Sequence, residues 1–247
     1  MDEFWGGGHG SHKRGKDKIE RVILWLAWFD YSDRKTIALM LGVKERGQGA
    51  FFKRLEESGF VKVDKAPGLK HSIYSLGDAG FDLAKILAPE IDLKRRRRLP
   101  AWITLVHSFS IQSAVIHRMD QVDGIYPEKT LKHLRAVRLP DAILQMKNGE
   151  RVAVEVELQH KATARVYHIY LAHLRNIKNE HYDRVLYLFP KETLRRLYEE
   201  KFVEPMWPIY KLNDQSRLAM DNTRQFDASN VQQAQLFQFK TEELYTL

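Results

Sequence analysis

The sequence predicts an α/β fold in two parts: a helical N-terminal part with a short hairpin, then a sandwich around a mixed β-sheet. Three observations predict this. Apolar residues recur at three- and four-residue spacing from residue 17 onward, which is the helical period. In mid-chain, Asn148-Gly149 separates two apolar runs, a strong hairpin signal. The continuous run VLYLF at 185–189 is typical of a buried strand between helices.

The composition limits the class of protein and of partner. A chain of 247 residues suffices for one large or two ordinary domains. The 40 Lys and Arg outnumber the 32 Asp and Glu, and the net charge of +8 favours a polyanionic partner. Nucleic acid is the first choice; an anionic membrane surface is the second, because no basic amphipathic terminal helix is evident.

The absence of cysteine excludes disulfides, zinc thiolate sites and cysteine nucleophiles. The N-terminus has no apolar signal core, and the longest apolar run, VILWLAWF, is too short to span a bilayer. We therefore expect a cytoplasmic protein without membrane insertion.

Residues 1–16 are glycine-rich and predict a disordered tail, and residues 17–90 form the first predicted domain. Its expected elements, in order, are a helix from residue 17, a short helix that Asp33 caps and Gly42 ends, a helix at about 48–58 that Gly59 ends, the strands FVKVDK and HSIYSL around a Pro67-Gly68 turn, and the helix GDAGFDLAKIL. Three short helices followed by a hairpin resemble a winged helix-turn-helix.

Polar and basic side chains on the third helix and the wing would meet phosphates and base edges if this domain binds DNA. These candidates are Arg46, Gln48, Lys53, Arg54, Lys62, Lys65 and Lys70. A solvated basic face is the plainer interpretation, and winged helices also serve as protein-docking modules. The basic charge of the whole chain favours DNA.

Residues 91–100 are predicted to be a basic linker between the two domains. Two prolines bracket five consecutive basic residues, Lys94 to Arg98. Such a run is usually a solvated linker. It can also hold a phosphate backbone, so Arg95, Arg96, Arg97 and Arg98 are further DNA-binding candidates.

Residues 101–247 form the second predicted domain. Its expected elements are a helix at about 102–119, short strands in GIYPE and AVRL, the hairpin around Asn148-Gly149, a helix at about 160–179, the strand VLYLF, the helix KETLRRLYEEKF, the strand WPIYKL and a possible edge strand QLFQF. This order predicts an α/β sandwich with a mixed central sheet.

The hairpin carries the residues with the most distinctive chemistry. Alternation along a strand places Glu155 and Glu157 on one face, and the hairpin can bring Asp141 beside Glu155. Lys161 adds an amine at the start of the next helix. Three carboxylates with an amine predict a partly solvated oxygen-ligand site for Mg²⁺ or Mn²⁺, an arrangement that can hydrolyse phosphodiesters. The plainer alternative is an amphipathic edge strand with two solvated glutamates.

These residues, in this order of elements, resemble the PD-(D/E)xK restriction-endonuclease-like fold. Pro140-Asp141 matches the family's first acid and Glu155 its second, but Glu157 stands where the family usually has lysine. Lys161 is placed as in relatives that move the lysine to the following helix. With a winged-helix module ahead of it, the chain resembles more specifically the MobC-type plasmid mobilisation relaxases, which are related to replication-relaxation proteins. This resemblance covers roughly residues 17–212.

The resemblance implies a metal-dependent DNA endonuclease that nicks one strand at a plasmid or mobile-element transfer origin. Its partners would be double-stranded DNA, single-stranded DNA and a coupling protein. The alternative is a non-catalytic DNA-binding replication or transcription regulator with a degenerate nuclease fold.

Each site residue has an expected role under this interpretation. Asp141 and Glu155 would hold Mg²⁺ or Mn²⁺, and Glu157 would hold a second metal or accept a proton from the attacking water. Lys161 would neutralise charge on the scissile phosphate. Arg165 and His168 would share a helix face with Lys161 and contact phosphates, with plain solvent exposure as the alternative.

The nucleophile has two candidates. Metal-activated water is the first choice. A tyrosine is the alternative, and Tyr167, Tyr170 and Tyr182 are near enough in sequence to be considered. Aromatic residues at helical spacing usually point into a core, which is the expectation for Tyr167 and Tyr170.

Overall fold

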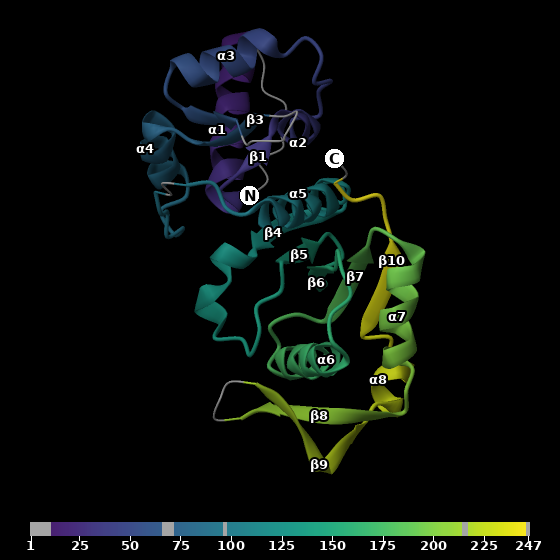
Figure 1. Cartoon of the computed structure of the whole chain (residues 1–247). Coiled ribbons are helices and arrows are strands. Elements are labelled where there is room, and N and C mark those ends of the chain that lie inside the picture. The colour runs from purple at the N-terminus through teal and green to yellow at the C-terminus, as the bar shows by residue number, and fades with distance from the viewer. Residues whose placement is uncertain (1–10, 66–71, 96–97, 214–216, 246–247) are drawn as a thin grey trace. The chain divides into compact units, whose positions relative to one another are not determined.

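The computed structural model describes residues 11–65, 72–95, 98–213 and 217–245. The described chain divides into two compact units, which we call unit 1 (residues up to Asp123, with Tyr245) and unit 2 (Gly124–Leu244). Both contain helices and strands (Figure 1), and the larger sheet is mixed, as the sequence predicts.

Unit 1 is built from five helices and a small antiparallel sheet in the order β1-β3-β2 among its described residues. Its elements are α1 (Ser11–Phe29), β1 (Ser32–Asp33), α2 (Arg34–Met40), α3 (Gly49–Glu57), β2 (Val61–Lys65), β3 (Ser72–Leu76), α4 (Asp78–Leu87) and α5 (Trp102–Ile116). Helix α1 begins within the segment predicted to be a disordered tail. The expected Pro67-Gly68 turn lies outside the described residues.

Local signals in the sequence explain where several of these elements begin and end. Asp33 caps α2, because its side chain accepts the backbone N–H of Thr36 at 2.7 Å. Gly42 and Gly59 follow α2 and α3 with φ of 68° and 67°, a left-handed conformation that glycine adopts without steric cost. The capping and the stops are as predicted.

Helix α5 belongs to unit 1, although the sequence predicts it as the first element of the second domain. The buried Gln112 side chain explains this: its Oε1 accepts from Trp25 Nε1 at 2.7 Å and from Ser32 Oγ at 2.8 Å. Its Nε2 donates to the carbonyl of Tyr31 at 2.8 Å. Because both polar atoms of this buried amide are hydrogen-bonded, Gln112 holds α5 against α1 and β1.

Tyr245, near the end of the chain, also belongs to unit 1. Its hydroxyl donates to Asp33 Oδ2 at 2.7 Å, and its ring lies edge-on to Phe109 of α5 with centroids 4.9 Å apart. The carboxylate that caps α2 therefore also binds a residue more than two hundred positions along the chain.

Unit 2 has a five-stranded sheet in the order β10-β7-β6-β5-β4 and a separate hairpin, β8-β9. Its elements are β4 (Val122–Pro127), the 3₁₀ turns η1 (Glu128–Thr130) and η2 (Lys132–Leu134), β5 (Ala142–Met146), β6 (Arg151–Val156), α6 (Thr163–Lys178), β7 (Arg184–Phe189), α7 (Glu192–Phe202), β8 (Met206–Leu212), β9 (Leu218–Asp227), α8 (Ser229–Gln233) and β10 (Phe237–Thr241). Strands β5 and β6 are antiparallel, whereas β6, β7 and β10 run parallel.

The core of unit 2 lies between the sheet and α6, with β8 and β9 on the other side of that helix (Figure 1). It is rich in aromatic side chains; Tyr170, Tyr187 and Trp207 are fully buried in it. Burial of such large rings dominates the energetics of a core. Among the described residues, no helix has both the length and the apolar character needed to cross a bilayer.

One predicted strand of unit 2 is absent, one strand was not predicted, and the predicted edge strand is present. The segment AVRL (136–139), which was predicted to be a strand, is not one; it lies in the connection from η2 to β5. Strand β9 was not predicted, since most of its side chains are polar and exposed. The predicted edge strand QLFQF is confirmed in β10, which pairs with β7 alone.

Candidate active site

The β5–β6 hairpin brings Asp141 beside Glu155. In its register Ala142 pairs with Val154, so one residue further along Asp141 stands opposite Glu155. Residues opposite each other in an antiparallel pair share a face of the sheet. Asp141 Oδ2 accepts the backbone N–H of Val156 at 2.7 Å, which fixes the carboxylate against β6. The hairpin geometry is as the sequence predicts.

Glu155 is buried, with only 1% of its surface exposed, and the prediction of a partly solvated glutamate is wrong. Strand β6 lies in the middle of the five-stranded sheet, and α6 covers the face that Glu155 shares with Ala153. Glu155 Oε2 accepts from Arg138 Nη2 at 3.0 Å, and Oε1 lies 3.2 Å from His173 Nε2. The carboxylate is therefore compensated inside the protein.

A chain of hydrogen bonds positions the ring of His173. Asn176 Nδ2 donates to the Tyr182 hydroxyl at 3.0 Å, and that hydroxyl lies 2.6 Å from His173 Nδ1. Since the hydroxyl accepts from Asn176, it is free to donate its own proton to Nδ1. Nε2, on the other side of the ring, faces Glu155 Oε1 at 3.2 Å.

The contact between His173 and Glu155 is close but poorly aligned. Glu155 Oε1 and His173 Nε2 are both buried, and neither has a well-formed hydrogen bond among the described residues. Buried polar atoms are nearly always satisfied in folded proteins. Glu155 Oε1 is therefore an oxygen with an unused lone pair at the centre of the candidate site.

Glu157 and Lys161 form the second half of the site. Glu157 follows β6, where its N–H donates to the carbonyl of Leu188 at 3.0 Å, and only 2% of it is exposed. The ammonium group of Lys161 contacts Glu157 Oε1. Lys161 precedes α6, which begins at Thr163, so the prediction that it lies on this helix is wrong. It consequently does not share a helix face with later residues.

The three carboxylates differ in their affinity for a proton. Burial, reinforced by the charge of Glu155, raises the pKa of Asp141 well above its ordinary value. Burial also raises the pKa of Glu157, against the opposing effect of Lys161. Although burial opposes ionisation of Glu155 too, His173 and Arg138 together lower its pKa to about 2. Asp141 and Glu157 therefore hold a proton more tightly than an ordinary carboxyl group, whereas Glu155 holds one less tightly.

The raised pKa of Asp141 predicts that Asp141→Asn stabilises the protein at about pH 7. The unfolded chain holds this proton less tightly than the folded protein, so ionised Asp141 lowers the free energy of unfolding above its unfolded pKa of about 3.9. Asn removes that penalty, and the gain should vanish below about pH 4. Urea denaturation in a chelating buffer at both pH values measures it.

Asp183→Asn is the matched control in the same unit. Hydrogen bonds from Arg151 lower the pKa of Asp183. This substitution should therefore lower the free energy of unfolding at about pH 7, opposite in sign to Asp141→Asn. A loss of stability in Asp141→Asn would show that this carboxylate is compensated in the folded protein.

Most of the predicted DNA-binding residues of unit 1 are on its surface. Lys53 and Arg54 are exposed on α3, and Gln48 is the residue that precedes this helix. The exposed candidates outside α3 are Arg46, Lys62, Lys65, Arg95 and Arg98. Lys70, Arg96 and Arg97 lie outside the described residues. The surface placement is compatible with DNA binding and equally with a solvated basic face.

Three of these cations already have partners among the described residues. Lys53 pairs with Glu57 at 3.5 Å, and Lys62 pairs with Asp64 at 2.9 Å. Arg95 contacts Asp78 and lies over the ring of Phe81, 4.8 Å from its centroid. Exposed pairs of this kind are weak and exchange readily for a phosphate.

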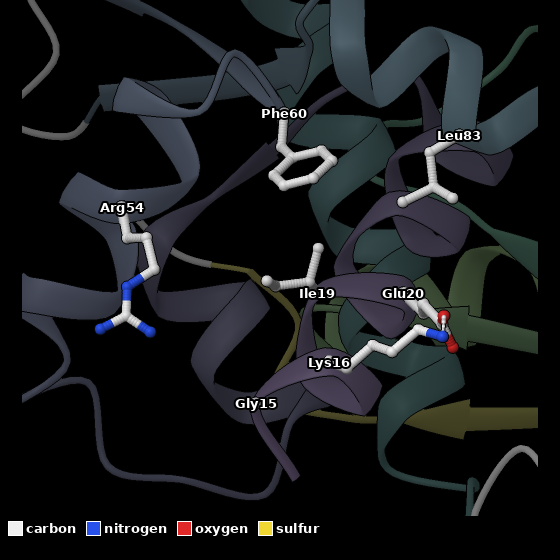
Figure 2. Close-up of a pocket in the computed structure, with 7 residues that line it drawn as sticks. All are labelled: Gly15, Lys16, Ile19, Glu20, Arg54, Phe60 and Leu83. Carbon is white, nitrogen blue, oxygen red and sulfur yellow. Dashed lines mark ion pairs between the residues drawn. The ribbon is translucent and has the colours of Figure 1, made fainter. Parts of the chain in front are cut away.

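Arg54 also lines a hollow between α3 and α1. Figure 2 shows its side chain across the hollow from Lys16 and Glu20 of α1, with Phe60 and Ile19 between them. Lys16 and Glu20 form an ion pair at 3.6 Å on the rim. The hollow is thus small, apolar inside and charged at its edge.

The remaining candidates are on α6 and in the core. Arg165 is exposed, and the half-buried His168 has its Nδ1 3.3 Å from the carbonyl of Tyr210. Tyr167, Tyr170 and Tyr182 are all buried, which confirms the expectation that the first two point into the core. Burial raises the pKa of each of these tyrosines, which makes the hydroxyl a poorer source of phenolate.

Three residues that contact the site were not among the sequence candidates: Arg138, His173 and Asn176. Tyr182, considered as a nucleophile, instead bonds to His173 and Asn176. Arg138 lies only three positions before Asp141, so its charge was a usable signal. His173 and Asn176 share the inward face of α6 with Tyr170, at three-residue spacing. Polar residues on an otherwise apolar helix face were the signal for both.

Comparison of the chain with protein-family models, with curated proteins and with solved structures finds no match. Within the residues that the structure describes, no group of three or more His, Asp or Glu side chains is arranged to hold a metal ion. The oxygen donors Asp141 and Glu155 nonetheless suit a hard divalent cation in kind.

Proposed function

We propose that this protein is a metal-dependent DNA endonuclease that nicks one strand, with its active site at the end of the β5–β6 hairpin. One observation supports the proposal: Asp141 and Glu155 stand opposite each other in the hairpin. Glu157 follows at the end of the same strand, β6, and Lys161 contacts it. A winged-helix architecture for unit 1 and a restriction-endonuclease-like one for unit 2 are part of the same proposal.

The balance of charge supports a cation at this place. Three carboxyl groups meet here, Asp141, Glu155 and Glu157, and the cations that contact them are Arg138 and Lys161. Burial and the charge of Glu155 raise the pKa of Asp141. A divalent cation would favour the ionised form of Asp141 and so lower this pKa.

The residues have distinct roles in the proposed reaction. Asp141 and Glu155 would hold Mg²⁺ or Mn²⁺, which would polarise the scissile phosphate and lower the pKa of water. Glu157, whose raised pKa suits a proton acceptor, would take the proton of the attacking water. Lys161 would release Glu157 and stabilise the charge that develops on the phosphate.

The target of this nicking is proposed to be the transfer origin of a plasmid or mobile element. The motif order around Asp141, Glu155 and Lys161, after a helical unit with a hairpin, supports this narrower proposal. A plasmid with a transfer origin would then be nicked at one site, and a plasmid without it would remain intact.

A non-catalytic DNA-binding regulator is the second candidate, and one observation favours it. Glu155 already pairs with Arg138, so this half of the site is stable without a cation. A buried ion pair can be retained for the uniqueness of the fold alone. In that case the carboxylates organise unit 2, and the surface of unit 1 supplies the function.

One assay distinguishes the nuclease from the non-catalytic regulator. Supercoiled plasmid is incubated with the protein in Mn²⁺, in Mg²⁺ or in chelator, with Asp141→Asn as the matched inactive variant. We expect open circles to form only with the wild-type protein and a metal. Plasmid that is bound yet stays supercoiled under all conditions would reject the nuclease and leave the regulator.

A further inference from the structure

The connection from β4 to β5, residues 128–140, begins and ends at the candidate active site; we call it the basic connection (the teal segment between β4 and β5 in Figure 1). The N–H of Glu128 donates to the carbonyl of Asp141 at 3.0 Å, which closes the segment on itself. Asn176 binds the backbone near the C-terminal end of the segment: it accepts from the N–H of Val137 at 3.0 Å and donates to the carbonyl of Arg138 at 2.7 Å.

The basic connection is folded, because its three leucines pack into the core of unit 2. Leu131 is buried between η1 and η2, and Leu134 and Leu139 pack against the same core. The hydroxyl of Thr130 donates to the carbonyl of Pro127 at 2.9 Å, which fixes the first turn. The polar side chains of the segment are therefore presented outward from an anchored backbone.

Those side chains are strongly basic. Residues 128–140 contain Lys129, Lys132, Arg135 and Arg138 against the single acid Glu128, a net charge of +3 (four minus one). Arg138 turns inward to Glu155, whereas Lys132 and Arg135 are exposed. Within the described part of the chain, neither of these two exposed cations has an ion pair with an acid.

Arg135 has a backbone conformation that arginine rarely adopts. Its φ of 49° lies in the left-handed region, which is less favourable for a residue with a Cβ than for glycine. The two turns need a left-handed residue here, and glycine or asparagine would satisfy that need at lower cost. An arginine at this position is therefore better explained by its charge than by the turn.

We propose that the basic connection binds the phosphate backbone of DNA beside the candidate active site, through Lys132 and Arg135. The anchors to Asp141 and Asn176 keep these two cations on the segment that leads directly into the carboxylates. This inference rests on the proposed function for its target, DNA, but the binding itself requires neither metal nor cleavage.

Salt-dependent DNA binding by the full-length protein in a chelating buffer tests the proposal. The affinity for a short fluorescent duplex is measured over a range of salt concentrations, for the wild type and for Lys132→Ala/Arg135→Ala. Each lost phosphate contact reduces the slope of log affinity against log salt by about 0.9. We expect the double variant to lose about 1.8 in slope, whereas Lys191→Ala/Lys240→Ala, with two exposed lysines of the same unit removed, keeps the wild-type slope.

Arg135→Gly separates the charge from the backbone conformation. Glycine relieves the left-handed strain, so the free energy of unfolding should stay equal or rise, while the slope falls by about 0.9. Arg135→Lys should retain the slope. An unchanged slope in both the double variant and Arg135→Gly would overturn the proposal.

The outcomes for the basic connection and for catalysis are independent. If the wild type never nicks plasmid but the double variant loses the expected slope, the basic connection binds DNA in a protein that is not a nuclease. If the wild type nicks and the double variant binds with the wild-type slope, the nuclease stands and the basic connection is only a solvated surface.

Discussion

Replacing Glu155 with alanine should both abolish nicking and lower the free energy of unfolding by about 3–5 kcal/mol. The loss of stability follows because the substitution leaves the guanidinium group of Arg138, only 27% exposed, without its carboxylate. The loss of nicking follows from the proposed role of Glu155 in holding the metal. Urea denaturation and the plasmid assay measure the two effects on the same preparation.

A double variant separates these two effects. Glu155→Leu/Arg138→Met replaces the buried pair with apolar side chains of similar size, which is often neutral for stability. We expect it to recover most of the free energy of unfolding and to remain unable to nick DNA. Nicking by the folded double variant would show that Glu155 is not a ligand. Wild-type stability in Glu155→Ala would instead show that Arg138 finds water or another acid.

Lys161→Ala should slow single-turnover nicking by about a hundredfold or more at saturating protein, with little change in DNA affinity. The ammonium group would act on charge that develops in the transition state, so the chemical step suffers more than binding. Lys161→Arg should rescue poorly, because a planar guanidinium group does not replace a compact point charge.

The contact with Glu157 gives Lys161 a second possible role, which a further variant resolves. If the lysine only keeps Glu157 ionised, Lys161→Ala/Glu157→Gln should nick no more slowly than Glu157→Gln alone. If it acts on the phosphate, the lysine deletion should slow nicking in both backgrounds. Wild-type rates in Lys161→Ala would leave Glu157 to act without it.

The hairpin was predictable because its determinants are local. Asn148-Gly149 fixes the turn, the turn fixes the register, and the register alone places Asp141 opposite Glu155. The burial of Glu155 was not predictable from the hairpin, because it depends on a parallel partner strand and on α6. Single-strand alternation shows which residues share a face and does not show whether that face is solvated.

The position of α5 was likewise beyond the sequence pattern. Its buried residues include Leu105, Phe109 and Ala114, so it is apolar on more than one side and suits either core. The hydrogen bonds of Gln112 hold α5 in unit 1, but the partners of a single amide in an apolar helix cannot be identified from the sequence. Strand β9 was missed for the opposite reason: its side chains are mostly exposed, and a strand held by backbone pairing with β8 leaves little hydrophobic signal.

The contact between Tyr245 and Asp33 bears on the order in which the protein can complete its folding. A chain emerges from the ribosome N-terminus first, so α2 and its capping aspartate are synthesised long before Tyr245. Unit 1 acquires this hydrogen bond only when synthesis has passed through the whole of unit 2. A contact over so long a stretch of chain carries a large loop-closure entropy when it forms from the unfolded state. If unit 2 folds first, the flexible chain between Asp33 and Tyr245 becomes shorter, and the entropy lost on forming their contact becomes smaller. The last hydrogen bond of unit 1 then depends on the folding of unit 2.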